Sequence, residues 1–96
     1  MTHDEILAMP AGTAIDELIA KLVFDEIYPR GEHVPEYSTD ISAAWEVVEK
    51  FEPFAMQKTV FWVATFSHEG KNYSSSGHTA PLAICRAALL TVDWEA

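Results

Sequence analysis

The chain has 96 residues, the size of one folded domain, and 49% of them are apolar, which excludes general disorder. Asp and Glu number 15 against 6 Lys and Arg, so the formal charge is −9. This balance argues against binding to duplex DNA or to an anionic membrane, because few cations are available to displace counterions. We therefore expect a single domain over residues 1–96, with no direct contact to nucleic acid or membrane.

The compartment is predicted from cysteine usage and from the N-terminus. Cys85 is the only cysteine, which rules out an internal disulfide and fits a reducing compartment. No run of about 18 apolar residues is present, so no segment is expected to span a bilayer. Asp4 and Glu5 stand where a signal peptide would need positive charge. These features predict a cytoplasmic protein.

The excess charge lies in the first half of the chain. Residues 1–52 hold all but three of the acids, whereas residues 53–96 are balanced, with three acids and three bases. One interpretation is the solvated side of amphipathic helices. The other is an acidic surface that imitates the phosphates of DNA and occupies a basic host protein.

Two short helices are predicted at the start of the chain. Thr2 and Glu5 have the spacing of a capping box, so a helix is expected to run to about Met9, before a Pro-Ala-Gly stop. A second helix is expected over residues 13–24, where apolar residues recur at i, i+3, i+4, i+7 and i+8. Residues 25–38 lack any period and are expected to form a loop.

Two further helices are predicted. One covers residues 40–52, and its apolar side consists of Ile41, Ala44, Trp45, Val48 and Phe51. The last covers residues 80–92, with Thr79 as its cap and Pro81 in its first turn. Arg86 is its only charged residue, so it is expected to lie centrally or at a subunit contact.

Three strands are predicted between these helices, over about 54–57, 59–67 and 71–77. Branched and aromatic residues dominate the central one, and Glu69-Gly70 marks a hairpin after it. Its two sides are Val60, Trp62, Ala64 and Phe66, and Phe61, Val63, Thr65 and Ser67. Because both sides carry large apolar residues, we expect helices or a neighbouring copy to cover both faces of the sheet.

The predicted fold class is therefore α+β: a helix/sheet/helix sandwich around a small antiparallel sheet of about three strands, with about four helices. A homo-oligomer, a dimer or larger, is expected wherever one sheet face is left open.

Four stretches in this order resemble the phage ABA sandwich domain, a family of small phage and prophage proteins. They are residues 5–12, 15–20, 34–50 and 79–90. The most specific blocks are Tyr-Ser-Thr-Asp-Ile at 37–41 and Thr-Ala-Pro-Leu-Ala-Ile-Cys-Arg at 79–86. The resemblance implies a viral origin and a helix/sheet/helix sandwich. It implies no chemistry at particular residues, and the loop over 25–36 is short beside the Trp-rich insertion of many members.

No catalytic motif is found. The four histidines form no helical i, i+4 pair and have no second cysteine nearby, so no zinc motif exists, and no phosphate loop or dinucleotide fingerprint is present. His68 and His78 flank the predicted hairpin and are the basis of a hydrolase hypothesis. Cys85 is expected to be a buried structural thiol. We predict no catalytic residue, no metal and no cofactor, and a binding protein rather than an enzyme.

The candidate ligand-binding residues gather around the entrance to the last helix. Free N–H groups and hydroxyls at the positive helix end favour an anion, charged side chains add attraction, and Tyr73 offers a ring for stacking. The set is Lys71, Tyr73, Ser74, Ser75, Ser76, His78, Thr79 and Arg86. The alternative is a polar edge strand followed by an ordinary cap, and capping is the preferred interpretation of residues 37–40 as well.

Three functions follow from these features, in order of preference. The first is a phage module that sequesters a small anionic, nucleotide-type ligand of host defence. The second is an acidic protein-interaction or DNA-mimic protein that acts on a host factor. The third is the hydrolase built on His68 and His78.

Overall fold

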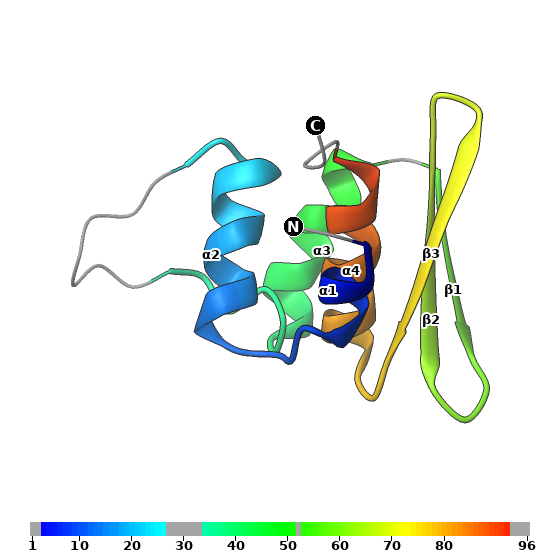
Figure 1. The fold of residues 1–96 in the computed structure, drawn as a ribbon, viewed down its shortest axis with the longest axis horizontal. Coiled ribbons are helices and arrows are strands. Elements are labelled where there is room, and N and C mark those ends of the chain that lie inside the picture. The colour runs from blue at the N-terminus through cyan, green and yellow to red at the C-terminus, as the bar shows by residue number, and fades with distance from the viewer. Residues whose placement is uncertain (1–2, 27–33, 52, 93–96) are drawn as a thin grey trace.

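The computed structural model describes residues 3–26, 34–51 and 53–92, so the tip of the predicted loop, residues 27–33, and Trp94 lie outside the described residues. The predicted α+β class is confirmed: the described residues form four helices and three antiparallel strands, arranged as Figure 1 shows. The elements are α1 (His3–Ala8), α2 (Thr13–Leu22), α3 (Ile41–Lys50), β1 (Phe54–Lys58), β2 (Trp62–His68), β3 (Lys71–Gly77) and α4 (Ala80–Thr91).

Side-chain caps begin the two longer helices of the second half. The Asp40 carboxylate accepts a hydrogen bond from the N–H of Ser42 (2.9 Å) at the start of α3. The Thr79 hydroxyl accepts one from the N–H of Leu82 (3.4 Å) at the start of α4. Each cap satisfies an N–H group that the helix itself leaves unpaired. The predicted cap at Thr79 is confirmed, and Asp40 is the residue of the 37–40 stretch that caps α3.

A buried polar contact joins the start of α2 to the segment that precedes α3. The Ser38 hydroxyl accepts from the N–H of Gly12 (2.9 Å), and the Asp16 carboxylate accepts from the N–H of Ser38 (2.8 Å). Asp16 is 4% exposed and Ser38 is fully buried. These groups pair with one another, so their burial leaves none of these hydrogen bonds unmade. The contact holds the start of α2 against Ser38, just before α3.

The sheet is a simple meander in the order β1-β2-β3. The β2–β3 turn places Glu69 and Gly70 at positive φ (52° and 78°), the geometry of a two-residue hairpin, as predicted. The central strand starts at Trp62, three residues later than predicted, because residues 59–61 form the turn from β1. Val60 is therefore 85% exposed at the tip of this turn, and its predicted place within the strand, on the same side as Trp62, is wrong.

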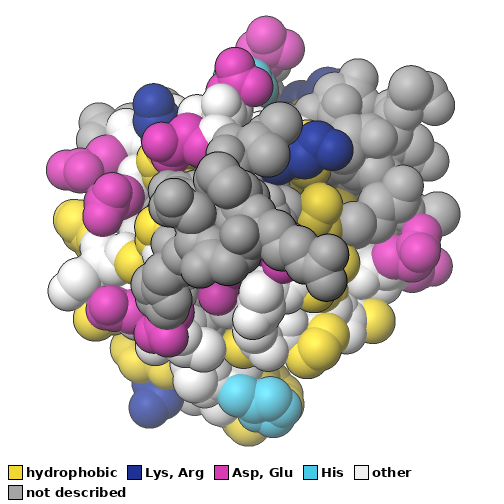
Figure 2. Space-filling model, turned by 90° about the vertical axis from the view of Figure 1, so that its left-hand side faces the viewer, with side chains coloured by type: hydrophobic (Ala, Val, Ile, Leu, Met, Phe, Trp, Pro, Cys, Tyr) yellow, Lys and Arg dark blue, Asp and Glu magenta, His cyan; other side chains and the backbone are white. Residues whose placement is uncertain are grey.

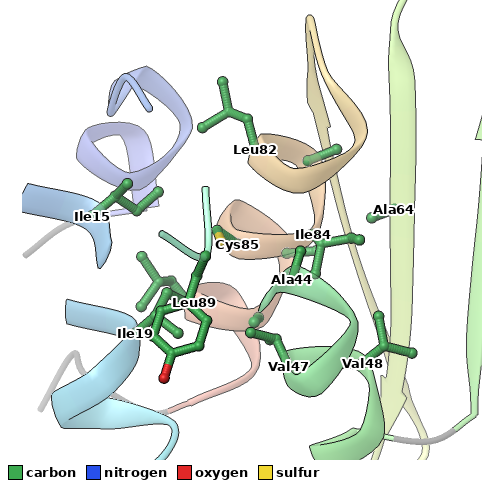
Figure 3. Close-up of a cluster of buried hydrophobic side chains, with 14 of the residues drawn as sticks. Ile15, Ile19, Ala44, Val47, Val48, Ala64, Leu82, Ile84, Cys85 and Leu89 are labelled. Carbon is green, nitrogen blue, oxygen red and sulfur yellow. The ribbon is translucent and has the colours of Figure 1, made fainter. Parts of the chain in front are cut away.

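The helices lie on one side of the sheet, with α4 against β2 and β3 and α2 farthest from the strands (Figure 1). The core surrounds α4, as predicted for its apolar sequence. Figure 3 shows Ile15 and Ile19 of α2 and Ala64 of β2 gathered around this helix. Cys85 is fully buried in this cluster, as predicted.

The opposite face of the sheet is open in the described chain. Exposed side chains on it include Ala55, Gln57, Ser74 and Ser76, and Phe61 at its end is 43% exposed. The expected helical cover of both faces is therefore not provided by the described residues. The physical reason is that this face is mainly small and hydroxylated, so covering it with helices would remove little apolar surface from water.

Two side chains of α3 predicted to be core are half exposed. Ile41 is 49% and Trp45 is 51% exposed, whereas Ala44 and Val47 of the same helix are fully buried. The buried pair is part of the cluster around α4, and the exposed pair is on the flank nearer β1. The core around α4 therefore covers only part of the apolar side of α3 and leaves Ile41 and Trp45 half exposed.

Candidate functional site

Strand alternation divides the three serines of the predicted site between the two faces of the sheet. Ser74 and Ser76 are exposed on the open face, and the Ser74 hydroxyl lies 2.7 Å from that of Thr65. Ser75 points to the helical side and is 5% exposed. Its hydroxyl has no hydrogen-bond partner among the described residues. Only the two outer serines are therefore available to a ligand on the open face.

The predicted site residues also lie at opposite ends of β3. Lys71 begins the strand at the hairpin, and His78 and Thr79 follow its other end. At about 3.3 Å per residue, Lys71 and His78 are roughly 20 Å apart along the strand. Tyr73 is half-buried on the helical side near the Lys71 end. Lys71 and Tyr73 therefore do not share a site with His78 in one chain.

The same separation applies to the two histidines of the hydrolase hypothesis. His68 pairs with Lys71 at the hairpin end of the sheet, whereas His78 follows Gly77 at the other end. The structure therefore does not bring His68 and His78 together as a catalytic pair, since such a pair needs hydrogen-bond reach of about 3 Å.

Arg86 of α4 is engaged by main-chain carbonyl groups. Its Nε and Nη2 donate to the carbonyl oxygen of Met9 (3.0 and 2.8 Å), and its Nη1 donates to that of Ser76 (2.8 Å). Burial lowers the pKa of this guanidinium from its ordinary value. The predicted role of Arg86 as a ligand-binding cation therefore competes with a structural role that joins the end of α1 to the outer edge of β3.

An aromatic pair that the sequence reading did not identify lies beside Ser76. The rings of Phe61 and His78 meet edge to face, with centroids 5.0 Å apart, and both side chains are exposed. The register explains the contact: Trp62 pairs with Gly77, so the next positions outward, 61 and 78, are neighbours on the open face. Strand pairing was the signal needed, and it was not available from the sequence alone.

The N-terminus of α4 lies next to this pair. Thr79 caps the helix directly after His78 and is exposed. The first turn of a helix presents N–H groups and partial positive charge, which favour anions. One corner of the molecule thus brings together Phe61, Ser76, His78 and Thr79, four residues of which three were predicted.

Residues 3–26, 34–51 and 53–92 contain neither a candidate membrane span nor a cluster of metal-ligating side chains. No helix among them has the length and hydropathy needed to cross a bilayer. Nor do these residues contain a group of three His, Cys, Asp or Glu side chains suited to a metal ion.

The chain resembles known phage proteins in sequence and in structure. Residues 17–89 match the phage ABA sandwich domain. The fold is similar to that of a phage protein from Bacillus cereus ATCC 14579, known from a 2.0 Å crystal structure, with a TM-score of 0.74 and 34% sequence identity over 88% of this chain and 94% of that one. No curated protein sequence matches the chain. This small protein therefore belongs to the phage ABA sandwich domain family.

Proposed function

We propose that this protein is a binding module, not an enzyme, which sequesters a small anionic, nucleotide-type ligand of host defence in the host cytoplasm. The observation that carries the proposal is the corner formed by Phe61, Ser76, His78 and Thr79. Exposed rings, an exposed hydroxyl and a helix N-terminus meet there, on a sheet face whose strand side chains between residues 55 and 76 carry no formal charge.

Each group at this corner suits a different part of a nucleotide. The Phe61 ring offers a surface for stacking a base, which contributes about 1–3 kcal/mol per base in comparable sites. The Ser76 hydroxyl suits a ribose hydroxyl or a phosphate oxygen. The N–H of Ala80 and an imidazole N–H of His78 suit a phosphate, whereas Pro81 has no N–H and the N–H groups of Leu82 and Ala83 donate to Thr79. The carboxylates that would repel an anion are concentrated in residues 3–51, which form the helical side.

Thermal-shift screening followed by calorimetry tests the proposal, with cyclic nucleotides and ADP-ribose derivatives as probes. We expect a probe to bind, and Phe61→Ala and His78→Ala to weaken it about tenfold or more. Lys71→Ala is the matched control, because it removes a cation about 20 Å away along β3 and should leave affinity unchanged. Absence of any shift at millimolar probe, or equal loss in the control, would contradict the proposal.

We also propose that a second copy covers the open face of the sheet. Support comes from Val63 at the centre of this face, an apolar side chain that an isolated chain leaves partly in water. Two acidic chains meet there with the least charge repulsion. Analytical ultracentrifugation should show a dimer or larger, and Val63→Lys should yield a monomer. A monomeric parent protein at high concentration would refute this assembly.

The acidic surface supports a second candidate function, binding to a basic host protein. Figure 2 shows carboxylates spread over the α2 side of the molecule, interspersed with hydrophobic side chains. Capture of a host protein should weaken as salt rises, and the double variant Glu17→Gln, Glu46→Gln should weaken it as well. Capture that is insensitive to salt would remove this candidate.

A further inference from the structure

Apolar side chains of α3 extend toward β1 without being fully covered. Ile41 and Trp45, one helical turn apart on the same side, are 49% and 51% exposed. The Trp45 ring meets Phe54 of β1 edge to face, with centroids 6.0 Å apart. This side of α3 therefore looks toward β1 and the edge of the sheet.

The spacing of the layers explains the exposure. The axis of α4 lies above the gap between β2 and β3, since this helix packs against both strands. Packed helices are roughly 8–10 Å apart, whereas neighbouring strands are about 4.8 Å apart. Because α3 packs beside α4 on the β1 side, it lies above the outer margin of β1 and the position that a fourth strand would take. The described sheet therefore ends at β1, and no strand of it lies beneath the exposed side chains of Ile41 and Trp45.

The edge of β1 also presents backbone groups for pairing. The N–H of Ser67 donates to the carbonyl of Pro53 (3.1 Å), so positions 55 and 57 pair with β2 in the same way. The N–H and C=O groups of Phe54, Met56 and Lys58 then point away from β2. An exposed lysine on an edge strand commonly prevents another strand from pairing there. Here the Lys58 Nζ lies over the Trp62 ring instead, 5.2 Å from its centroid.

The opposite edge of the sheet is different. The outward carbonyl of Ser76 on β3 already accepts a hydrogen bond from Arg86, which in turn holds Met9 at the end of α1. The chain therefore covers part of the β3 edge with its own side chain. The β3 edge can therefore serve as a control for peptide binding at the β1 edge.

We propose that the outer edge of β1, which no other described strand pairs with, is a docking site for an extended peptide segment of a partner protein, which adds as a fourth strand. Its inward side chains are apolar, because they pack beneath Ile41 and Trp45. It carries basic residues, because the exposed Glu46 and Glu49 flank Trp45 on a chain of net charge −9. A second copy fits poorly, since its own α3 would enter the same space with the same acids. The proposal is independent of the anion site.

The probe is a synthetic seven-residue peptide that alternates valine and lysine, blocked at both ends. Hydrogen exchange of the protein's amides, followed by NMR, reports where it pairs. We expect saturating peptide to slow exchange at Met56 and Lys58 at least tenfold and to leave Gln57, already paired with β2, nearly unchanged. The same peptide with proline at its centre cannot complete the ladder and should not protect these amides.

Two variants complete the test. Met56→Pro removes an outward N–H from β1 and should abolish binding, whereas Ser74→Pro makes the equivalent change at the β3 edge and should retain it. Equal affinity of both variants, or protection by the proline peptide, overturns the proposal. Protection of Met56 and Lys58 in the free protein that rises with protein concentration places a second copy on this edge and also overturns it. The exchange measurement on the unaltered protein holds even if a variant fails to fold.

Discussion

Substitution of Gly77 by alanine tests the close approach of β3 to the first turn of α4. A Cβ built at Gly77 would lie 2.9 Å from the backbone nitrogen of Ala83 and 3.2 Å from the Cβ and Cγ of Leu82. The nearest atom belongs to the backbone of a buried helix and cannot rotate away. Overpacking of this kind costs about 1–3 kcal/mol, and the rigid neighbour places Gly77→Ala near about 3 kcal/mol. A change of this size lowers the Tm by roughly 12–24 °C in a domain this small.

Gly70→Ala is the matched control for this prediction. Gly70 has a φ of +78°, but nothing lies within 4 Å of the Cβ that alanine would add. Its cost is therefore conformational only, about 1 kcal/mol. Urea unfolding of the parent and both variants, followed by circular dichroism, gives the two free-energy changes. If Gly77→Ala loses no more stability than Gly70→Ala, the inferred tight packing of β3 on α4 is incorrect.

Three other substitutions have definite expected outcomes. Arg86→Met removes three hydrogen bonds, two of them partly buried bonds to the Met9 carbonyl and one an exposed bond to the Ser76 carbonyl, and should cost about 1–3 kcal/mol in urea unfolding. Asp40→Ala removes the cap of α3 and should cost about 1 kcal/mol, with increased amide exchange in its first turn. Burial, assisted by the charge of Asp16, raises the pKa of the Cys85 thiol, so the folded state keeps the proton that the unfolded chain loses. The free energy of unfolding should then fall by up to about 1.4 kcal/mol per pH unit above about pH 8.5, and Cys85→Ala should lack this component; an identical pH dependence in both proteins would contradict the burial argument.

Local patterns were sufficient to predict most elements of this fold. The caps at Asp40 and Thr79, the proline in the first turn of α4 and the turn at Glu69-Gly70 all depend on interactions within a few residues. Such short-range signals are present in the sequence itself. The apolar sequence of α4 likewise predicted its central place, since a helix without a polar side has to be surrounded.

The features that the sequence did not predict depend on how the elements are arranged. Alternation correctly placed Phe61 and Val63 on the face opposite Trp62, but it contains no information on whether a helix covers that face. Trp45 has the spacing of a core residue, yet it is 51% exposed, because spacing alone does not say which neighbouring element covers that side of α3. The contact of Phe61 with His78 required the register of β2 on β3, which a single sequence does not specify.

The contact between Gly12, Asp16 and Ser38 makes the segment that joins α2 to α3 a permissive position for inserted sequence. Ser38, near the end of this segment, is hydrogen-bonded to Gly12 and Asp16 at the start of α2, so the placement of α3 beside α2 does not rest on the length of the segment. Doubling a flexible connection costs only about 0.6 kcal/mol of closure entropy. A reporter peptide or a small foreign domain grafted into this segment should leave the remaining scaffold intact.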